Sequence, residues 1–254
     1  MYAEERHRTI VNRALRQERV SVTELAEEFG VTTETIRRDL DALDRRGLLR
    51  RVHGGAVAAN GFTLLETGLA EREPASATQK VRIAEAALRY LPAQPGTVLL
   101  DAGTTTGRLA GLLTANAVTG VVTNSLPAAG QLAANGVKVR LLGGNVRGIT
   151  GATVGSETVG ALSRLRCDVA FIGTNGISMH HGFSTPDHDE AAVKEAMVRA
   201  ANFVVVLADS SKLGAELLVG FAALNQADVL ITDDGIDEAD VADLRAAGVE
   251  VVIA

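Results

Sequence analysis

The stretch VTTETIRRDLDALDRRGLLRRVHGGA, residues 31–56, decides the fold of the first part of this 254-residue chain. Its middle predicts a helix, because Ile36, Leu40 and Leu43 recur at offsets of four and three and form one apolar stripe. A hydroxyl at Thr32 or Thr33 would cap the start of that helix by accepting a hydrogen bond from a backbone N–H. The stretch therefore predicts a helix that buries one face and exposes the others.

The exposed faces of this helix and the tail after it are rich in arginine. Between residues 37 and 51 there are six arginines against three aspartates, Asp39, Asp41 and Asp44. A guanidinium group donates two hydrogen bonds in one plane, which suits both phosphate and guanine. We therefore predict that this helix enters a DNA major groove.

Two shorter segments before it complete a helix-turn-helix. Residues 4–16 have the pattern of an amphipathic helix, and Ser21 with Glu24 forms a capping-box pattern that would start a second, short helix. Gly30 would end that helix, and the arginine-rich helix follows at once. Residues 47–55 predict a small β-wing. Any three-helix bundle has such apolar stripes, but the arginine density and the basic, glycine-rich tail favour DNA binding.

The pattern assigns DNA contacts to both parts of this predicted winged helix-turn-helix. The residues expected to face the groove and its phosphates are Thr32, Thr33, Thr35, Arg37 and Arg38. Those expected in the wing are Arg51, His53 and Gly54, and we add Ser21 at the start of the second helix.

The composition bounds the remaining classes. The net charge is −6, but residues 1–57 hold 11 basic and 10 acidic side chains, whereas the rest hold 14 and 21, so the acidity belongs to the larger part. Local charge on one face decides phosphate binding. The single cysteine, Cys167, excludes an intrachain disulfide. The sequence has neither a signal-peptide pattern nor an apolar run of about 20 residues, and we expect a cytoplasmic protein.

From residue 79 the pattern changes to alternating strands and helices. The strands are continuous runs of Val, Ile and Leu, which predicts a mostly parallel sheet covered by helices on both faces. We therefore predict an α/β chain with three parts: a winged helix-turn-helix domain over residues 1–57, a linker over 58–78, and an effector-binding domain over 79–254.

Four polar clusters follow predicted strands of this second domain. They are residues 101–106 (DAGTTT), 123–125 (TNS), 142–144 (LGG) and 209–212 (DSSK). Ligands of open parallel sheets collect at the carboxyl ends of the strands, so four equivalent clusters favour one shared site. The first cluster suits phosphate, because Gly103 allows close backbone approach at a helix start, and Lys212 would supply a counter-charge. Each cluster taken alone is also what ordinary turns and caps require.

Two further groups of polar residues have simpler explanations. Glu190 and Lys194 are four residues apart on a predicted helix, which on spacing alone indicates an ordinary surface ion pair. His180, His181 and His188 lack the helical spacing of metal ligands, and we expect no metal site. The chain has no Walker loop, no G-x-S-x-G and no G-x-G-x-x-G before a helix, so we expect neither a cofactor nor catalytic residues.

The motifs together resemble the DeoR family of bacterial transcriptional regulators. The resemblance rests on TIRRDL and HGGA in the first part and on LLDAGTTT, VTNS, LLGGNVR, AFIGTNGIS and LADSSKLG in the second. It implies a second domain similar in fold to ribose-5-phosphate isomerase that senses a phosphorylated sugar. It also turns Glu190 and Lys194 into site candidates. The residues that it places around the effector are Asp101, Gly103, Thr104, Thr105, Thr106, Asn124, Ser125, Gly143, Gly144, Asn175, Glu190, Lys194, Asp209 and Lys212.

The resulting expectation is a repressor of carbohydrate-metabolism genes that binds operator DNA as a homodimer or higher homo-oligomer and is released by a sugar phosphate. The stretch HGFSTPDHDEAAVKEAMV is most similar to members linked to fructose and other phosphotransferase-imported sugars. The alternative is an isomerase that carries a DNA-binding domain, with Glu190 as base and Lys194 as its electrostatic partner. An activator is not separable from a repressor by sequence.

Overall fold

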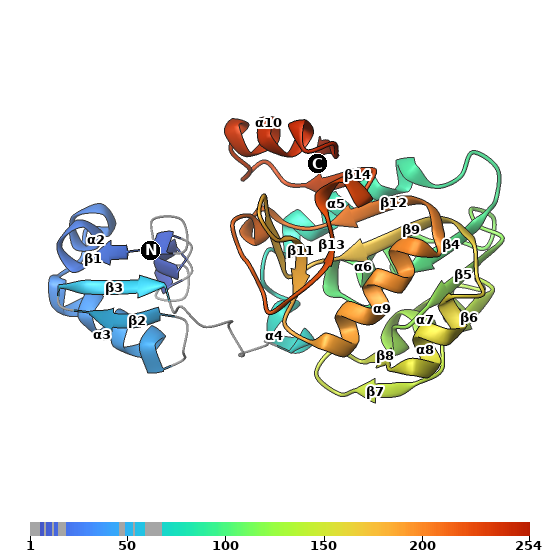
Figure 1. Ribbon diagram of the computed structural model, residues 1–254, viewed down its shortest axis with the longest axis horizontal. Coiled ribbons are helices and arrows are strands. Elements are labelled where there is room, and N and C mark those ends of the chain that lie inside the picture. The colour runs from blue at the N-terminus through green and yellow to red at the C-terminus, as the bar shows by residue number, and fades with distance from the viewer. Residues whose placement is uncertain are drawn as a thin grey trace. The chain divides into compact units, whose positions relative to one another are not determined.

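The computed structural model describes residues 6, 7, 9–11, 13, 14, 19–45, 49–52, 54–58 and 68–254, with the backbone alone at 45, 50, 58, 70 and 71. Its contacts divide the chain into two compact units, Met1–Glu66 and Thr67–Ala254 (Figure 1). Each unit is built around its own core of buried side chains.

The first unit contains the predicted helix-turn-helix. Helix α2 (Val22–Phe29) ends at Gly30, whose φ of 62° is the left-handed conformation that glycine adopts without strain. Helix α3 (Thr33–Arg45) follows, and the Thr32 hydroxyl accepts a hydrogen bond from the Thr35 N–H at 3.1 Å, which confirms the predicted cap. The described residues from 6 to 14 are helical as well. The predicted stripe Ile36, Leu40 and Leu43 is buried.

One detail of the predicted helix start is wrong. Ser21 occupies the position before α2, but its side chain makes no capping hydrogen bond, so the capping box is not formed. Ser21 is instead the last residue of strand β1 (Arg19–Ser21) and pairs with Gly55. A Cβ at Gly55 would lie 1.9 Å from the Val20 carbonyl oxygen, so the two strands approach more closely here than any other residue would allow.

The wing is a β-hairpin. Strands β2 (Leu49–Val52) and β3 (Gly55–Ala58) pair antiparallel, and β1 adds to β3, which gives the strand order β1-β3-β2. Gly54 in the hairpin turn has a φ of 80°, a value that favours glycine. His53, which was predicted to lie in the wing, is outside the described residues, as is Arg46.

The second unit is built on a seven-stranded sheet in which every neighbouring pair is parallel, as the continuous apolar runs predicted. The strand order is β15-β14-β12-β9-β4-β5-β6. The strands are β4 (Thr97–Leu100), β5 (Gly120–Thr123), β6 (Val139–Leu141), β9 (Cys167–Gly173), β12 (Ala201–Leu207), β14 (Val229–Thr232) and β15 (Glu250–Ile253).

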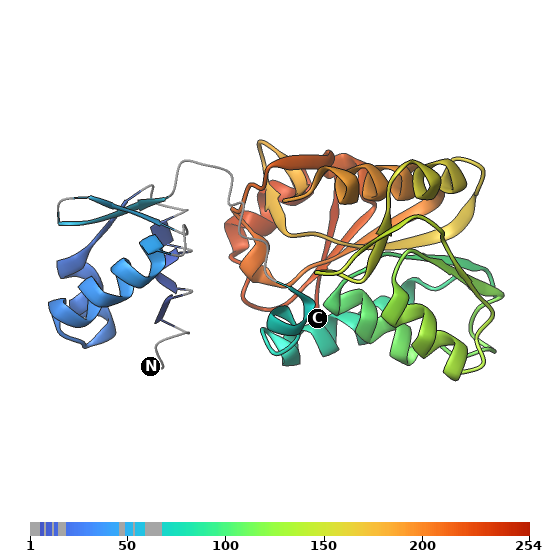
Figure 2. The same cartoon turned by 90° about the horizontal axis from the view of Figure 1, so that it is seen from below.

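Helices cover both faces of this sheet, as Figure 2 shows for the green and the yellow-orange layers. Helices α5 (Ala77–Ala87), α6 (Thr104–Leu112) and α7 (Leu126–Ala134) share one apolar core with the sheet. Helices α8 (Ser156–Leu162), α9 (His188–Arg199) and α10 (Glu238–Ala246) share the other core. The single-turn helices are η1 (Leu88–Tyr90), η2 (Ser210–Lys212) and η3 (Leu224–Gln226). Among the described residues, no helix has the length and apolar character of a membrane span.

Two small antiparallel sheets accompany the main one. A hairpin joins β7 (Asn145–Arg147) to β8 (Ala152–Val154), and a second sheet contains β10 (Gly176–Ser178), β11 (Gly182–Thr185) and β13 (Val219–Ala222). Most of these strands are three residues long, which is too short for the alternation that would have predicted them.

Part of the segment predicted as a linker, residues 58–78, belongs to the second unit. Residues 69–72 form a short helix, α4 (Leu69–Arg72), and α5 starts at Ala77, two residues before the predicted start of the domain. The Leu69 N–H donates to the Ile149 carbonyl at 3.1 Å, which ties α4 to the β7–β8 hairpin.

Candidate functional site

The strand order of the sheet identifies where a ligand would bind. The chain runs from β4 to β5 and β6 in one direction, then returns to β9 and continues through β12 in the other. The order therefore reverses between β4 and β9. In open parallel sheets, ligands bind in the crevice outside the carboxyl ends of the strands at such a point. Asp101 follows β4, and Gly173 ends β9.

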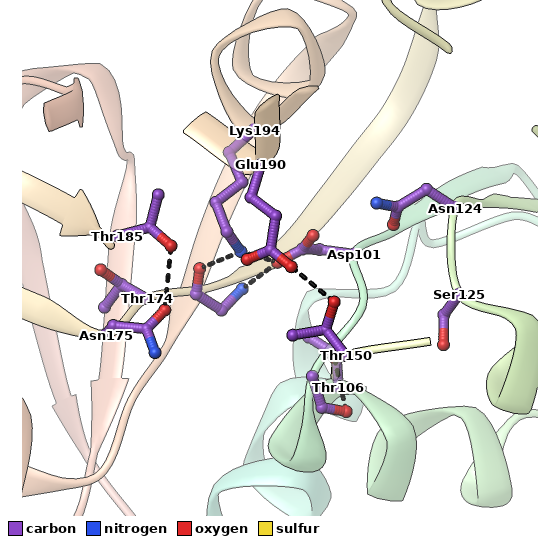
Figure 3. Close-up of polar contacts among 12 residues, drawn as sticks. Asp101, Thr106, Asn124, Ser125, Thr150, Thr174, Asn175, Thr185, Glu190 and Lys194 are labelled. Carbon is purple, nitrogen blue, oxygen red and sulfur yellow. Dashed lines mark hydrogen bonds and ion pairs between the residues drawn. The ribbon is translucent and has the colours of Figure 1, made fainter. Parts of the chain in front are cut away.

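A buried ion pair lies at this point. The Lys194 ammonium contacts the Asp101 carboxylate and donates to the Gly173 carbonyl at 2.9 Å (Figure 3). The Gly173 N–H donates to the same Asp101 oxygen at 3.0 Å. Complete burial raises the pKa of Asp101, and the Lys194 charge and the Gly173 N–H offset part of that rise. Lys194 thus connects the carboxyl end of β4 to that of β9.

Glu190, one turn before Lys194 on α9, makes a second set of contacts. Its carboxylate accepts from Thr150 Oγ1 at 2.6 Å and from the Arg147 guanidinium at 2.8 Å. Arg147 also lies 3.3 Å from the Asp187 carboxylate, and Asp187 caps α9 by accepting from the Glu190 N–H at 2.9 Å. Both α9 side chains are buried and paired with other elements, so the interpretation of a surface ion pair from spacing alone is wrong.

Asn124, which follows β5, faces the same cluster. Figure 3 shows its side-chain amide extending toward Asp101 and Glu190. The amide nitrogen donates to the Thr153 carbonyl at 3.3 Å. Asn124 is only 2% exposed, and its Oδ1 has no hydrogen-bond partner among the described residues. A buried acceptor without a donor costs about 1–3 kcal/mol, so this atom is a candidate to accept a hydrogen bond from a ligand.

The threonine-rich turn after β4 opens into a cavity of about 650 Å³. Its described lining residues include Gly103, Thr104 and Ser125, but not Asp101, Glu190 or Lys194. Thr105 and Thr106 are buried, and the Thr106 hydroxyl donates to the Gly103 carbonyl at 3.2 Å. Ser125 caps α7 by accepting from the Ala128 N–H at 3.3 Å. Thr106 and Ser125 therefore do the work of turns and caps, whereas Gly103 and Thr104 face open space.

Gly143 and Gly144 pack against α8 and the end of β8. The Thr158 hydroxyl donates to the Gly143 carbonyl at 2.6 Å. Gly144 has a φ of 141°, and a Cβ there would lie 2.2 Å from the Thr158 oxygen and 2.5 Å from the Val154 carbonyl oxygen. These contacts explain Gly144 without a ligand, whereas a Cβ at Gly143 would meet no atom within 4 Å.

The last three predicted residues come from two other loops. The Asn175 side-chain oxygen accepts from the Thr185 hydroxyl at 3.2 Å. Asp209 precedes η2 and accepts from the Ser211 N–H at 3.2 Å, while Lys212 at the end of η2 is half-buried. Lys212 and Asp209 both act electrostatically on Lys80 of α5, which places the 209–212 turn beside that helix.

Sequence reasoning missed three of the residues that the structure brings to this region: Arg147, Thr150 and Lys80. Arg147 and Thr150 sit in a stretch of repeated glycines, 143–151, which gave no helical or strand pattern to place them. Lys80 did leave a signal. It precedes Ile83, Ala84 and Ala87 at offsets of three, four and seven, so it lies on the buried face of α5, where a lysine is rare without a partner.

The first unit carries its polar side chains at the surface. Thr32, Thr33, Arg37 and Arg38 are exposed along α3, and Thr35 is half-buried. Arg37 and Arg38 lie 3.7 and 3.5 Å from Glu34, distances of loose pairs. In the wing, the Arg51 guanidinium lies 3.4 Å from Asp41. The Arg51 backbone N–H donates to Asp44 at 3.2 Å, so the hairpin is held against α3.

Comparison with known proteins identifies both units. A model of the DeoR-like helix-turn-helix domain matches residues 6–61, and a model of the DeoR C terminal sensor domain matches residues 75–234. The chain belongs to the DeoR family. Its winged helix-turn-helix and its parallel α/β sheet domain are thus the two domains of a DeoR-family transcriptional regulator, as the sequence motifs predicted.

Several curated members of the DeoR family are similar over nearly the whole chain. The uncharacterized HTH-type transcriptional regulator FruR of Bacillus subtilis is 36% identical over 233 residues, 92% of each chain. The HTH-type transcriptional regulator GlpR of Haloferax volcanii is 38% identical over 252 residues, 99% of this chain and 98% of its own. The glycerol-3-phosphate regulon repressor of Escherichia coli is 30% identical over 230 residues, 90% of each. Among solved structures, ribose 5 phosphate isomerase A of Neisseria gonorrhoeae matches 53% of this DeoR-family chain and 52% of its own at 18% identity, with a TM-score of 0.40.

Proposed function

We propose that this chain is a repressor of carbohydrate-metabolism genes that binds operator DNA and is released by a phosphorylated sugar. The observation that carries the proposal is the unpartnered, buried Oδ1 of Asn124 beside Asp101 and Glu190. A sugar hydroxyl donates the hydrogen bond that this atom lacks. The name of the Escherichia coli relative, glycerol-3-phosphate regulon repressor, supports a small phosphorylated polyhydroxy compound as the chemical class of the effector.

The effector would span two kinds of environment in the second unit. Its hydroxyl groups would meet Asn124, Glu190 and Asn175, which offer oxygen acceptors at the carboxyl ends of the strands. Its phosphate would meet the start of α6 at Gly103 and Thr104, where backbone N–H groups without helical partners favour an anion, and Lys212 would balance the charge.

Operator DNA would bind to the first unit. The exposed Thr33, Arg37 and Arg38 of α3 would reach base edges and phosphates in the major groove, while Arg51 and Gly54 of the wing would contact the backbone. One half-site of this size gives limited affinity, so we propose a homodimer or higher homo-oligomer on a repeated operator.

We further propose that the second unit binds its sugar phosphate without converting it. A base for isomerisation needs a carboxylate free to take a proton from the substrate. The Glu190 carboxylate accepts from Arg147 and Thr150, and the Lys194 ammonium is held by Asp101. Incubation with pentose and hexose phosphates tests this. Turnover that disappears in Glu190→Gln would establish the isomerase instead.

The function is tested by pairing operator selection with an effector screen. Duplex DNA selected from a random library by the purified protein provides the operator, and fluorescence anisotropy measures its affinity. We expect one or a few sugar phosphates to lower that affinity about 5- to 150-fold, the range of an allosteric coupling of about 1–3 kcal/mol. The same sugars without phosphate serve as matched controls. Operator affinity that no sugar phosphate changes would refute the proposal.

A further inference from the structure

Helix α4 is the first element of the second unit that the chain enters from the DNA-binding unit, and its C-terminal end is held by a buried lysine. The Lys80 ammonium donates to the Arg72 carbonyl, the last of α4, at 2.5 Å. The Arg108 guanidinium of α6 donates to the next residue, Glu73, at 2.7 Å to the carboxylate and 3.4 Å to the carbonyl. Lysine and arginine stabilise a helix C-terminus in this way, because the last carbonyls lack helical donors.

The Lys80 ammonium is buried close to other cations. It is 4% exposed, and burial lowers the pKa of its ammonium to about 8, with the charges of Lys212 and Arg108 adding to the decrease and those of Asp209 and Glu73 opposing it. Three cations from α5, α6 and η2 therefore crowd one place. A bound anion would relieve their mutual repulsion and favour the charged form of Lys80.

The crowded cations lie beside open space. Glu73 and Arg108 line the same cavity of about 650 Å³ as Gly103 and Thr104 at the start of α6. The chain has four lysines. Two of them, Lys80 and Lys212, belong to this group of cations, and Lys194 forms the buried ion pair with Asp101. An anion at the start of α6 thus shares the cavity with Arg108, and the charge of Arg108 acts on the buried Lys80 that holds the end of α4.

The other end of α4 is connected to the buried cluster. The Leu69 N–H donates to the Ile149 carbonyl, and the next residue, Thr150, donates to Glu190. The start of α4 is therefore linked through two hydrogen bonds to Glu190, which is proposed to contact the effector.

We propose that α4 is the output element of the sensor domain, and that Lys80 exchanges the Arg72 carbonyl for the anionic group of the bound effector. The proposal rests on the proposed function only in identifying that anion with the effector's phosphate. A charge-assisted hydrogen bond to a phosphate oxygen is stronger than one to a neutral carbonyl, so this change of partner is favourable once the anion is present. The last turn of α4 then loses its cap, and the chain leading to the DNA-binding unit is anchored differently in the two states.

Hydrogen–deuterium exchange of the full chain tests the exchange of partners. The reporters are the amides of Arg72 and Glu73, which donate to the Gly68 and Leu69 carbonyls at 3.0 and 2.8 Å. We expect inorganic phosphate to speed their exchange at least about fivefold, the effect of losing one hydrogen bond to a charged group. The Lys80→Met variant should exchange fast at these amides without phosphate and show no further change. The matched control is Lys138→Met, an exposed lysine outside the site, which should behave like the wild type.

A second measurement uses pH and does not require a variant that folds. Sulfate keeps its charge from pH 7 to pH 9, so its affinity reports the protein alone. Lys80 carries its proton below about pH 8 and loses it above, so sulfate binding should weaken about tenfold by pH 9 in the wild type and in Lys138→Met. In Lys80→Met the affinity should be low and nearly independent of pH.

Three results would overturn the inference. Phosphate that protects the α6 turn, residues 103–108, while leaving the α4 amides unchanged would remove α4 from the response. An unchanged phosphate response in Lys80→Met would remove Lys80. Phosphate that changes exchange nowhere would remove the anion site. Failure of the proposed function gives a different pattern, because operator binding would then ignore sugar phosphates while the α4 amides still respond to phosphate.

Discussion

The two units of this chain handle charge in opposite ways. On α3 the Arg37 and Arg38 side chains are 56% and 80% exposed and only loosely paired with Glu34. In the sensor domain the Lys194 and Asp101 side chains are 5% and 2% exposed and in direct contact. This difference is what the two proposed partners would require. A DNA duplex is bound at an exposed surface, whereas a small ligand is surrounded by buried groups that are paired with one another in its absence.

Among the described residues of the first unit, Asp39 on the same helix is an exception. Asp39 is buried between Arg6, at 2.6 and 3.1 Å, and His7, at 2.8 Å. Burial alone would raise the pKa of Asp39, but the bonds from Arg6 and His7 lower it below its usual range. Helix α3 thus has its buried charge paired with the first residues of the unit and leaves Arg37 and Arg38 at the surface.

The largest effect that we predict comes from breaking this buried pair. Asp39→Ala leaves Arg6 buried without a partner, and an arginine does not give up its proton, so the free energy of unfolding of the first unit should fall by about 3–5 kcal/mol. Denaturant unfolding, monitored by hydrogen–deuterium exchange at the amides of α3, measures this loss. Asp41→Ala, at an exposed position on the same helix, is the control and should change stability by less than about 1 kcal/mol.

The corresponding break in the sensor domain should cost less. Lys194→Met leaves Asp101 unpaired, but a carboxyl whose pKa burial already raises can take up a proton, so we expect a loss of about 1–3 kcal/mol at pH 7.5. The pKa of Asp101 in the folded variant lies above its unfolded value, so the stability is present at acid pH and lost as pH rises through the folded pKa. Unfolding curves at pH 5 and 7.5 should differ in that direction. The pKa of Asp39 is lowered in the folded state, so the first unit of the wild type should show the opposite dependence. Its free energy of unfolding should decrease as the pH falls.

A loss of DNA binding without a loss of stability would distinguish the exposed charges from the buried ones. If Arg38 reads a base, Arg38→Ala should weaken operator binding by about 1–3 kcal/mol and leave stability unchanged. Arg140→Ala, at an exposed arginine of the sensor domain, is the matched control. Equal affinity of the two variants in an anisotropy titration would take Arg38 out of the interface.

The smallest effect concerns two glycines with open surroundings. A Cβ at Gly30 or at Gly130 meets no atom within 4 Å, so only the backbone conformation decides the outcome. Gly30→Ala forces a side chain into the left-handed region and should destabilise the first unit by about 1–2 kcal/mol. Gly130→Ala, inside α7, should stabilise the second unit by about 0.5–1 kcal/mol. Thermal unfolding that shifts both variants in the same direction would contradict this explanation.

The sequence predicted those parts of the fold that depend on neighbours along the chain. The helix-turn-helix, the cap at Thr32, the turn at Gly30 and the parallel sheet all follow from local periods and turn residues, and the structure has each of them. The capping box at Ser21 failed because the same residue is claimed by pairing with Gly55, a contact 34 positions away that no local pattern contains.

The site was predictable only in part, for the same reason. Polar residues at strand ends pointed to Asp101 and Asn124, but the reversal between β4 and β9 depends on strand order, which periodicity does not reveal. The ion pairs of Glu190 and Lys194 join segments more than 40 residues apart. The roles of the predicted DNA and effector contacts stay predictions that the variants above address.

The placement of Glu190 and Lys194 on one turn of α9 has a consequence for how ligand preference diverges. Both residues lie on the same rigid helix, so a substitution that shifts one ion pair disturbs the other as well. Substitutions at these two positions would disturb the ion pairs before they altered the ligand preference of the proposed site. We expect new specificities on this scaffold to arise in the turn after β4, for example at Thr104, which lines the cavity, and not on α9 or on the residues that bond to it.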